Sequence, residues 1–147
     1  MFLKQLKLTN FRNYSETSLT FDNHPTILLG NNAVGKSNLL EAIYFLSTTK
    51  SQRVEIEVEL IKEGESFSRV EGALSENPDV IPAEAGIHLN TSSSKLDPRL
   101  HGDDSNTDLE ITLQNIDNQF SKRLKVNWVS RRVVDFFGNL PAVIFYP

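Results

Sequence analysis

Residues 30–37, with the sequence GNNAVGKS, have the types and spacing of a phosphate-binding loop. They fit the pattern of glycine, any four residues, glycine, lysine and then serine or threonine. Gly30 and Gly35 allow backbone conformations in which successive N–H groups point inward at phosphate oxygens. We expect Lys36 to reach the β- and γ-phosphates and the Ser37 hydroxyl to ligate Mg²⁺. The pattern therefore predicts a site for nucleotide phosphates.

Residues on both sides of the loop supply the context that the pattern needs. Before it, residues 26–29 form a short apolar run that predicts a buried strand. After it, apolar side chains recur at helical spacing and predict a helix to about residue 48, whose N-terminus would favour negative charge. A chance match in an ordinary glycine turn is the alternative, and it occurs about once in two hundred chains of this length.

Contacts to the nucleotide are expected from the whole loop and from the residue after it: Gly30, Asn31, Asn32, Ala33, Val34, Gly35, Lys36, Ser37 and Asn38. Asn38 could add a polar contact at the phosphates, or it could simply cap the first helical turn. The histidines have no ligand spacing, so we expect no histidine-based metal site; they are His24, His88 and His101.

The composition is that of a soluble globular chain with one modest core. The chain has 147 residues, of which 39% are hydrophobic and 23% are charged. It has no cysteine, which excludes disulfides and thiolate metal sites. No apolar run approaches the ~20 residues of a membrane span, and the N-terminus lacks the apolar region of a signal peptide. These features predict a cytoplasmic protein with no membrane partner.

Residues 76–106 differ in composition from the rest of the chain. They hold six acidic and two basic residues, which accounts for the whole net charge of −4. Three prolines and the lack of a sustained period predict a loop or disordered insertion. The neutral remainder argues against a basic nucleic-acid surface. Basic clusters at residues 122–125 and 131–132 could contact nucleic-acid phosphates or lie solvated at the surface.

Alternation of apolar and polar side chains predicts four further strands, at residues 2–9, 15–22, 54–61 and 67–74. Residues 109–126 predict a hairpin whose turn is rich in Asn and Asp. Ser130 is expected to cap a short helix that runs through Phe137 and ends at Gly138. Residues 141–146 predict the start of a last strand.

Three stretches together resemble the RecF family of bacterial replication and recombinational repair ATPases, of the ABC/SMC-like class. They are LKLTNFRNY at 6–14, the loop and helix at 30–53, and KVNWVSRRVVDFFGNLPAVIFYP at 125–147. The resemblance implies an α/β fold: the N-terminal portion of an ABC/SMC-type P-loop ATPase head with an antiparallel β subdomain. It divides the chain into three parts. Residues 1–75 are the N-terminal part of the head, residues 76–106 are the insertion, and residues 107–147 are a truncated continuation of the head. The insertion looks like an inert translated palindromic element.

The same resemblance implies ATP and Mg²⁺ as cofactors and DNA binding at single-strand/double-strand junctions, in DNA replication, repair and the SOS response. The implied protein partners are a second copy of the family protein, dimerised head to head, and recombination-mediator proteins. Arg12 lies in a turn that approaches the nucleotide in this class, so it could contact phosphate or base, or be an ordinary surface arginine. Lys50 and Arg53 could face DNA or form a solvated helix end.

The chain departs from the family in its length and in the insertion at 76–106, and the first of these departures leaves the activity open. The family protein is much longer, and its Walker B acid and signature motif have no counterpart in these residues, although hydrolysis needs an acid that positions water. One alternative is therefore a decayed or truncated gene fragment with weak nucleotide binding and no independent activity. Another is a stand-alone DNA-binding or scaffolding module with no nucleotide role.

Overall fold

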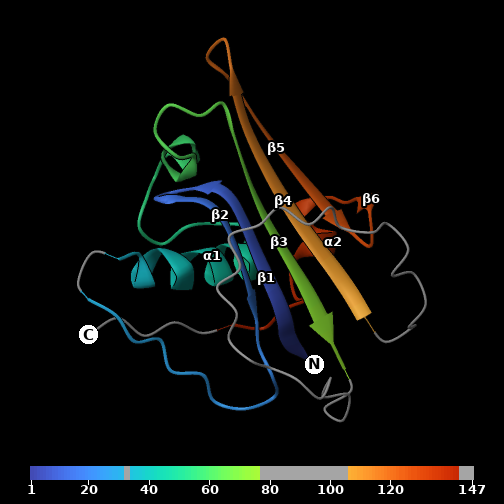
Figure 1. Ribbon diagram of the computed structural model, residues 1–147. Coiled ribbons are helices and arrows are strands. Elements are labelled where there is room, and N and C mark those ends of the chain that lie inside the picture. Colours follow the sequence, from blue (N-terminus) through green and yellow to red (C-terminus); the bar gives the residue numbers. More distant parts are fainter. Residues whose placement is uncertain (32–33, 77–105, 143–147) are drawn as a thin grey trace.

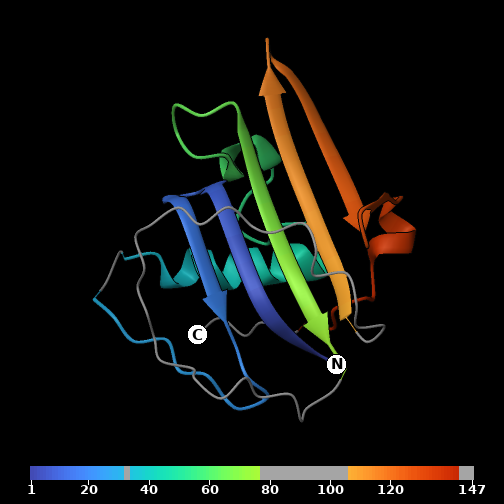
Figure 2. The same ribbon diagram turned by 45° about the vertical axis from the view of Figure 1, so that its right-hand side comes forward.

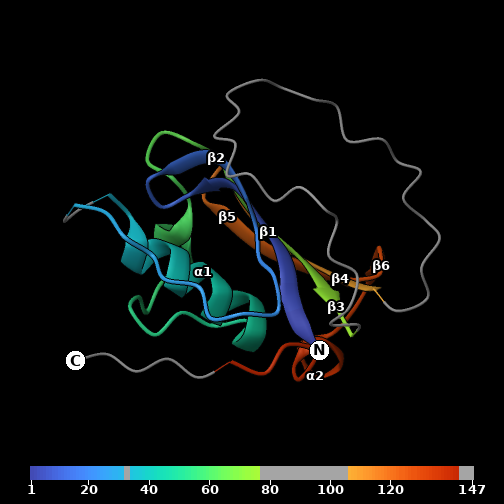
Figure 3. The same ribbon diagram turned by 60° about the horizontal axis from the view of Figure 1, so that its bottom comes forward.

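The computed structural model describes residues 1–31, 34–76 and 106–142. They form a six-stranded antiparallel sheet in the order β2-β1-β3-β4-β5-β6 (Figure 1). The strands are β1 (Phe2–Phe11), β2 (Tyr14–Thr20), β3 (Phe67–Ser75), β4 (Asn106–Ile116), β5 (Gln119–Val126) and β6 (Val129–Ser130). The helices are α1 (Lys36–Thr48), the short 3₁₀ helix η1 (Glu57–Leu60) and α2 (Val133–Phe136). Helix α1 crosses one face of the sheet (Figures 2 and 3).

The strand register separates an apolar face of the sheet from a charged one. A row of aliphatic side chains crosses four strands beneath α1 and consists of Leu8, Val70, Ile111 and Leu124. The neighbouring row, on the opposite face, consists of Lys7, Glu71, Glu110 and Lys125. Successive residues of a strand point to opposite faces, so this alternation confines the core to the side that α1 covers. The helix contributes four buried apolar side chains to it: Leu39, Ala42, Phe45 and Leu46.

Gly72 in β3 lets α1 approach the sheet closely. A Cβ atom at this position would lie only 2.3 Å from Cδ2 of Leu46, which is itself fully buried. Atoms cannot approach so closely, so any side chain here would force the helix or its leucine to move. Because α1 begins at the candidate phosphate loop, this contact also helps to fix the helix that carries the loop.

Several of the predicted elements are confirmed. The strands expected at 2–9, 15–22 and 67–74 correspond to β1, β2 and β3. The hairpin expected at 109–126 corresponds to β4 and β5, joined by Asp117 and Asn118, whose φ angles are 51° and 60°. Two consecutive residues with positive φ make the turn whose twist matches that of a hairpin, and Asp and Asn tolerate this conformation.

The buried strand expected at residues 26–29 is wrong. This segment belongs to no strand, and Ile27 and Leu29 are 80% and 89% exposed. A buried strand needs a neighbour for its backbone hydrogen bonds, and no strand in the described part of the chain pairs with this segment. Ile27 and Leu29 therefore lie on the surface of the described fold, whereas Leu28 is half-buried against the core.

The strand expected at residues 54–61 is also wrong, because η1 occupies its centre. Only Ile61 forms a bridge, to Phe11, and hydrogen bonds from Arg12 N to Leu60 O and from Lys62 N to Asn10 O hold the segment across the end of β1. Leu60 is fully buried whereas Ile56 is 62% exposed, so the strict alternation of the sequence does not correspond to two faces of a strand.

The end of the described chain differs from the expectation in its details. Ser130 belongs to β6 and caps nothing, and α2 begins at Val133 with Arg132 at its N-cap and no capping side chain. Gly138 follows the helix with a φ of 93°, as expected for a residue that ends it. The insertion at 77–105 and the greater part of the last predicted strand, 143–147, lie outside the described residues.

Candidate nucleotide-binding site

The side chain of Lys36 spans the described part of the phosphate loop. Its Nζ donates hydrogen bonds to the carbonyl oxygens of Gly30 and Asn31, at 2.6 and 2.7 Å. An ammonium group has three N–H donors, so one remains for an anion. The two carbonyls thus hold the charge at the mouth of the loop. Asn32 and Ala33, from which contacts are also expected, lie outside the described residues.

The N-terminus of α1 presents unused hydrogen-bond donors beside this lysine. Gly35 is the N-cap residue, no side chain caps the helix, and no acidic residue lies in its first turn. The first amides of a helix have no intrahelical acceptor, and the helix dipole makes this end electropositive. Ser37 is exposed, and within the described residues no hydrogen bond engages its hydroxyl. One helix end therefore combines an ammonium group, free amides and a hydroxyl, as binding a phosphate and its metal ion requires.

The turn between β1 and β2 packs against the outside of the loop. The Tyr14 hydroxyl donates a hydrogen bond to the carbonyl oxygen of Gly35 at 3.2 Å, and Asn13 Nδ2 donates to that of Val34 at 3.4 Å. Gly35 has a φ of 107°, and a Cβ atom there would lie 2.7 Å from Asn13 Nδ2. Both its backbone conformation and this contact require glycine.

Arg12 contacts a buried carboxylate. Its Nε and Nη2 donate to the two oxygens of Glu41 at 3.0 and 2.8 Å, and its Nη1 donates to the carbonyl oxygen of Glu59. Glu41 is 1% exposed and also accepts a hydrogen bond from Ser51 Oγ at 2.5 Å. This bidentate pair ties the β1–β2 turn to the second turn of α1. A contact between Arg12 and a nucleotide remains a prediction.

Asn38 and Arg53 extend the same polar network. Asn38 Nδ2 donates to Asn13 Oδ1 at 2.9 Å, and Asn38 does not cap the helix. Arg53 Nη1 donates to Asn38 Oδ1 at 2.9 Å and lies 3.5 Å from a Glu41 oxygen, whereas Lys50 is exposed. The loop pattern contains neither Asn13 nor Tyr14, and the only sequence signal for them is their place in NFRNY at residues 10–14.

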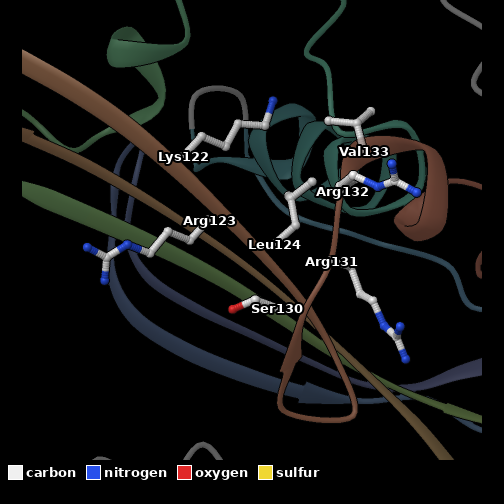
Figure 4. Close-up of a pocket in the computed structure, with 7 residues that line it drawn as sticks. All are labelled: Lys122, Arg123, Leu124, Ser130, Arg131, Arg132 and Val133. Atoms are coloured by element: carbon white, nitrogen blue, oxygen red, sulfur yellow. The ribbon is translucent and has the colours of Figure 1, made fainter.

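A basic pocket of about 460 Å³ lies elsewhere, between β5, β6 and α2 (Figure 4). Lys122 points toward the end of α1, where its Nζ donates to the carbonyl oxygen of Thr49, and it pairs with Glu57 of η1 at 2.6 Å. Arg132 pairs with Asp135 at 3.1 Å. The guanidinium groups of Arg123, Arg131 and Arg132 point in different directions (Figure 4). Because these charges diverge or are already paired, the pocket is not a preorganised anion site.

The described residues contain no cluster of three or more His, Cys, Asp or Glu side chains that could hold a metal ion. Among the helices in the described ranges, none is long and apolar enough to cross a membrane.

Comparison with protein families matches residues 1–128 to the family described as AAA ATPase domain. Among curated proteins, the DNA replication and repair protein RecF of Thermosynechococcus vestitus is 36% identical over 146 residues, which cover 99% of this chain and 31% of that protein. RecF of Streptococcus thermophilus is 34% identical over 148 residues, covering all of this chain and 32% of that protein. The chain thus spans about a third of the length of these relatives.

Solved structures agree with these matches. The structure of the recombination mediator protein RecF-ATP in the RecFOR pathway aligns with a TM-score of 0.73 and 28% identity, over 99% of this chain and 33% of that one. A second RecF structure, titled RecF-ATPrS, aligns with a TM-score of 0.72. The resemblance to RecF and the fold class, α/β and the N-terminal portion of a P-loop ATPase head with an antiparallel sheet, are both confirmed.

Proposed function

This chain belongs to the AAA ATPase domain family, and from that premise we propose that it binds ATP through residues 30–37. The observation that carries the proposal is the position of Lys36. Two loop carbonyls hold its ammonium group beside the N-terminus of α1, which no side chain caps. A triphosphate placed there would meet a positive point charge, free amides and the positive end of the helix dipole together. The alignment with a structure titled RecF-ATP supports the same ligand.

Mg²⁺ is proposed as the second cofactor, with Ser37 as its protein ligand. The Ser37 hydroxyl is exposed at the start of α1 and makes no hydrogen bond within the described residues, so it is available to a cation that bridges phosphate oxygens. When bound, the ion would neutralise phosphate charge. The residues proposed to contact the nucleotide are those expected from the sequence: Gly30, Asn31, Asn32, Ala33, Val34, Gly35, Lys36, Ser37, Asn38 and Arg12.

The wider role proposed is that of RecF, to which the chain is similar: DNA replication and recombinational repair in the cytoplasm. The proposed partners are DNA at single-strand/double-strand junctions, a second copy of the protein and recombination-mediator proteins. Within this role, residues 1–75 and 107–147 would form the ATPase head and 76–106 an insertion. Fluorescence anisotropy with labelled gapped DNA over a salt series tests whether the chain binds DNA. Binding that needs ATP supports it, whereas steeply salt-dependent binding without nucleotide favours a module with no nucleotide role.

Calorimetry with ATP and Mg²⁺ tests the proposal on the 147-residue chain. We expect binding that Lys36→Ala abolishes, because this change removes the charged phosphate ligand. Lys50→Ala is the matched control, since it removes the same charge from an exposed position after α1. Unchanged affinity in Lys36→Ala would refute the assignment. A parallel phosphate-release assay distinguishes an active ATPase from the alternative, a fragment that binds nucleotide weakly without turnover.

A further inference from the structure

The contacts between the β1–β2 turn and the phosphate loop serve a purpose that the loop pattern does not explain. We propose that Asn13 and Tyr14 are positioning residues, which hold two loop carbonyls outward so that the amides on the inner side face the phosphates. The inference deepens the proposed function and rests on it. It is carried by two hydrogen bonds, to the carbonyl oxygens of Val34 and Gly35, and by the close packing of both side chains on Gly35.

Peptide geometry links these outer contacts to the inner face of the loop. In a trans peptide the C=O and N–H groups point in opposite directions. The carbonyl that Asn13 holds shares its peptide with the N–H of Gly35, and the carbonyl that Tyr14 holds shares its peptide with the N–H of Lys36. The Gly35 oxygen also accepts the first hydrogen bond of α1, from Leu39 N at 2.9 Å, so Tyr14 adds to a carbonyl that the helix already orients, whereas among the described residues Asn13 alone holds that of Val34. Fixing both oxygens in this way aims both amides away from the turn. Successive inward amides of this kind form an anion-binding concavity.

The direction of the Asn13 amide is itself determined by a chain of donors and acceptors. A guanidinium group can only donate, so the Asn38 atom that faces Arg53 Nη1 must be its oxygen. Nδ2 of Asn38 then faces Asn13 and requires an acceptor there, which leaves Nδ2 of Asn13 to face the Val34 carbonyl. No amide in this series can flip without placing two donors or two acceptors against each other. The arginine after the helix thus sets which atom of Asn13 meets the loop.

Both ends of the series are anchored on one buried carboxylate. Glu41 accepts two hydrogen bonds from Arg12, the residue before Asn13, and it lies 3.5 Å from Arg53. Glu41 is 1% exposed and lies one turn beyond the loop in α1. The turn, the loop and the segment after the helix are thereby connected in a closed ring of polar contacts. A ring of this kind holds the loop in its binding conformation before the nucleotide arrives, which is how a positioning residue raises affinity.

Three variants test the inference by calorimetry with ATP and Mg²⁺. Tyr14→Phe removes only the hydroxyl, Asn13→Ala removes the whole amide, and Asn13→Asp places an acceptor against the Val34 carbonyl. We expect roughly 3- to 10-fold weaker ATP binding for the first two, the equivalent of the one neutral hydrogen bond that each loses to the loop, and a larger loss for Asn13→Asp. Gln5→Ala is the control, because it removes a side-chain hydrogen bond, to Ser18, from the same hairpin but away from the loop. Its ATP affinity should equal that of the wild type.

The amide of Gly35 provides a readout that a merely structural role would not move. The chain has seven glycines, so selective ¹⁵N-glycine labelling gives a small set of resonances that can be assigned. In the protein without nucleotide, we expect Tyr14→Phe and Asn13→Asp to shift the Gly35 amide resonance while the thermal midpoint stays within about 2 °C, since each variant alters a single hydrogen bond of an exposed or half-buried side chain.

The outcomes separate the inference from the proposed function. If the wild type binds ATP and Lys36→Ala abolishes the binding, but all three turn variants bind as the wild type does, the positioning role is wrong and the proposed function stands. If the wild type does not bind ATP, the proposed function fails. An unchanged Gly35 resonance in both Tyr14→Phe and Asn13→Asp overturns the inference whether or not ATP binds.

Discussion

Replacement of Glu41 by glutamine tests whether the buried carboxylate holds the site together. Its two oxygens accept hydrogen bonds from Arg12 at 3.0 and 2.8 Å and from Ser51 at 2.5 Å, and Arg53 lies 3.5 Å away. Glutamine has nearly the same shape but no charge. Its NH₂ group would also face a guanidinium N–H, donor against donor. The substitution therefore leaves two arginines facing one neutral acceptor.

The magnitude follows from the burial of the partners. Removing one partner of a fully buried ion pair costs about 3–5 kcal/mol. The side chains of Arg12 and Arg53 are 19% and 41% exposed, so water can partly replace the lost acceptor. We therefore expect Glu41→Gln to lower the free energy of unfolding by about 2–4 kcal/mol. The same change should weaken ATP binding, because Glu41 anchors both ends of the ring around the loop.

Urea unfolding at pH 7, followed by far-ultraviolet circular dichroism, measures this loss. Glu57→Gln is a matched control: it makes the same chemical change in an ion pair, with Lys122, whose members are 22% and 18% exposed. We expect the control to lose less, about 1 kcal/mol, because the Glu57 carboxylate is 22% exposed where that of Glu41 is 1% exposed, so water can solvate it. A loss in Glu41→Gln no larger than that of the control would refute the reasoning, since burial would then make no difference.

Two further predictions concern the sheet beneath α1. Gly72→Ala should lower the free energy of unfolding by about 1–3 kcal/mol through overpacking against Leu46. In urea unfolding, the double variant Gly72→Ala/Leu46→Ala should lose less than the sum of the two single losses. Strictly additive losses would contradict the contact between the two residues. Burial, and secondarily the charge of Glu110, raise the pKa of Glu71 in spite of the opposing charges of Lys7 and other cations. The folded state then holds this proton more tightly, so the contribution of Glu71 is favourable below its unfolded pKa and is lost as pH rises through the folded value. Glu71→Gln should therefore raise the urea midpoint at pH 7 relative to the wild type, with a difference that disappears near pH 4; a lower midpoint at pH 7 would contradict the sign.

The features that depend on near neighbours in the chain could be predicted from the sequence. The spacing within residues 30–37, the helix after them and the Asp117-Asn118 turn all involve groups a few residues apart. The alternation that predicts β1, β2 and β3 follows from the pleat of a single strand, so it needs no knowledge of the partner strand. The resemblance to RecF depends on motifs of the same local kind.

The strands predicted at 26–29 and 54–61 are wrong because a strand is defined by its neighbour. An apolar or alternating run becomes a strand only where another strand supplies hydrogen bonds, and within the described chain neither run has such a partner along its length. Propensity alone cannot show that Leu60 would be buried in a 3₁₀ turn across the end of β1.

The polar ring around the loop is the clearest case of a feature that tertiary structure decides. The sequence by itself indicated that residues 30–37 could cradle a phosphate and that Arg12 follows the first strand in a turn, and the resemblance to RecF implied that this turn approaches the nucleotide. That the guanidinium of Arg12 pairs with Glu41, 29 positions along the chain, depends on how α1 packs on the sheet. A buried carboxylate must find hydrogen-bond donors wherever packing brings them, and packing distances are set by side-chain shapes such as the missing Cβ of Gly72. No pattern of residue types along the chain carries that information.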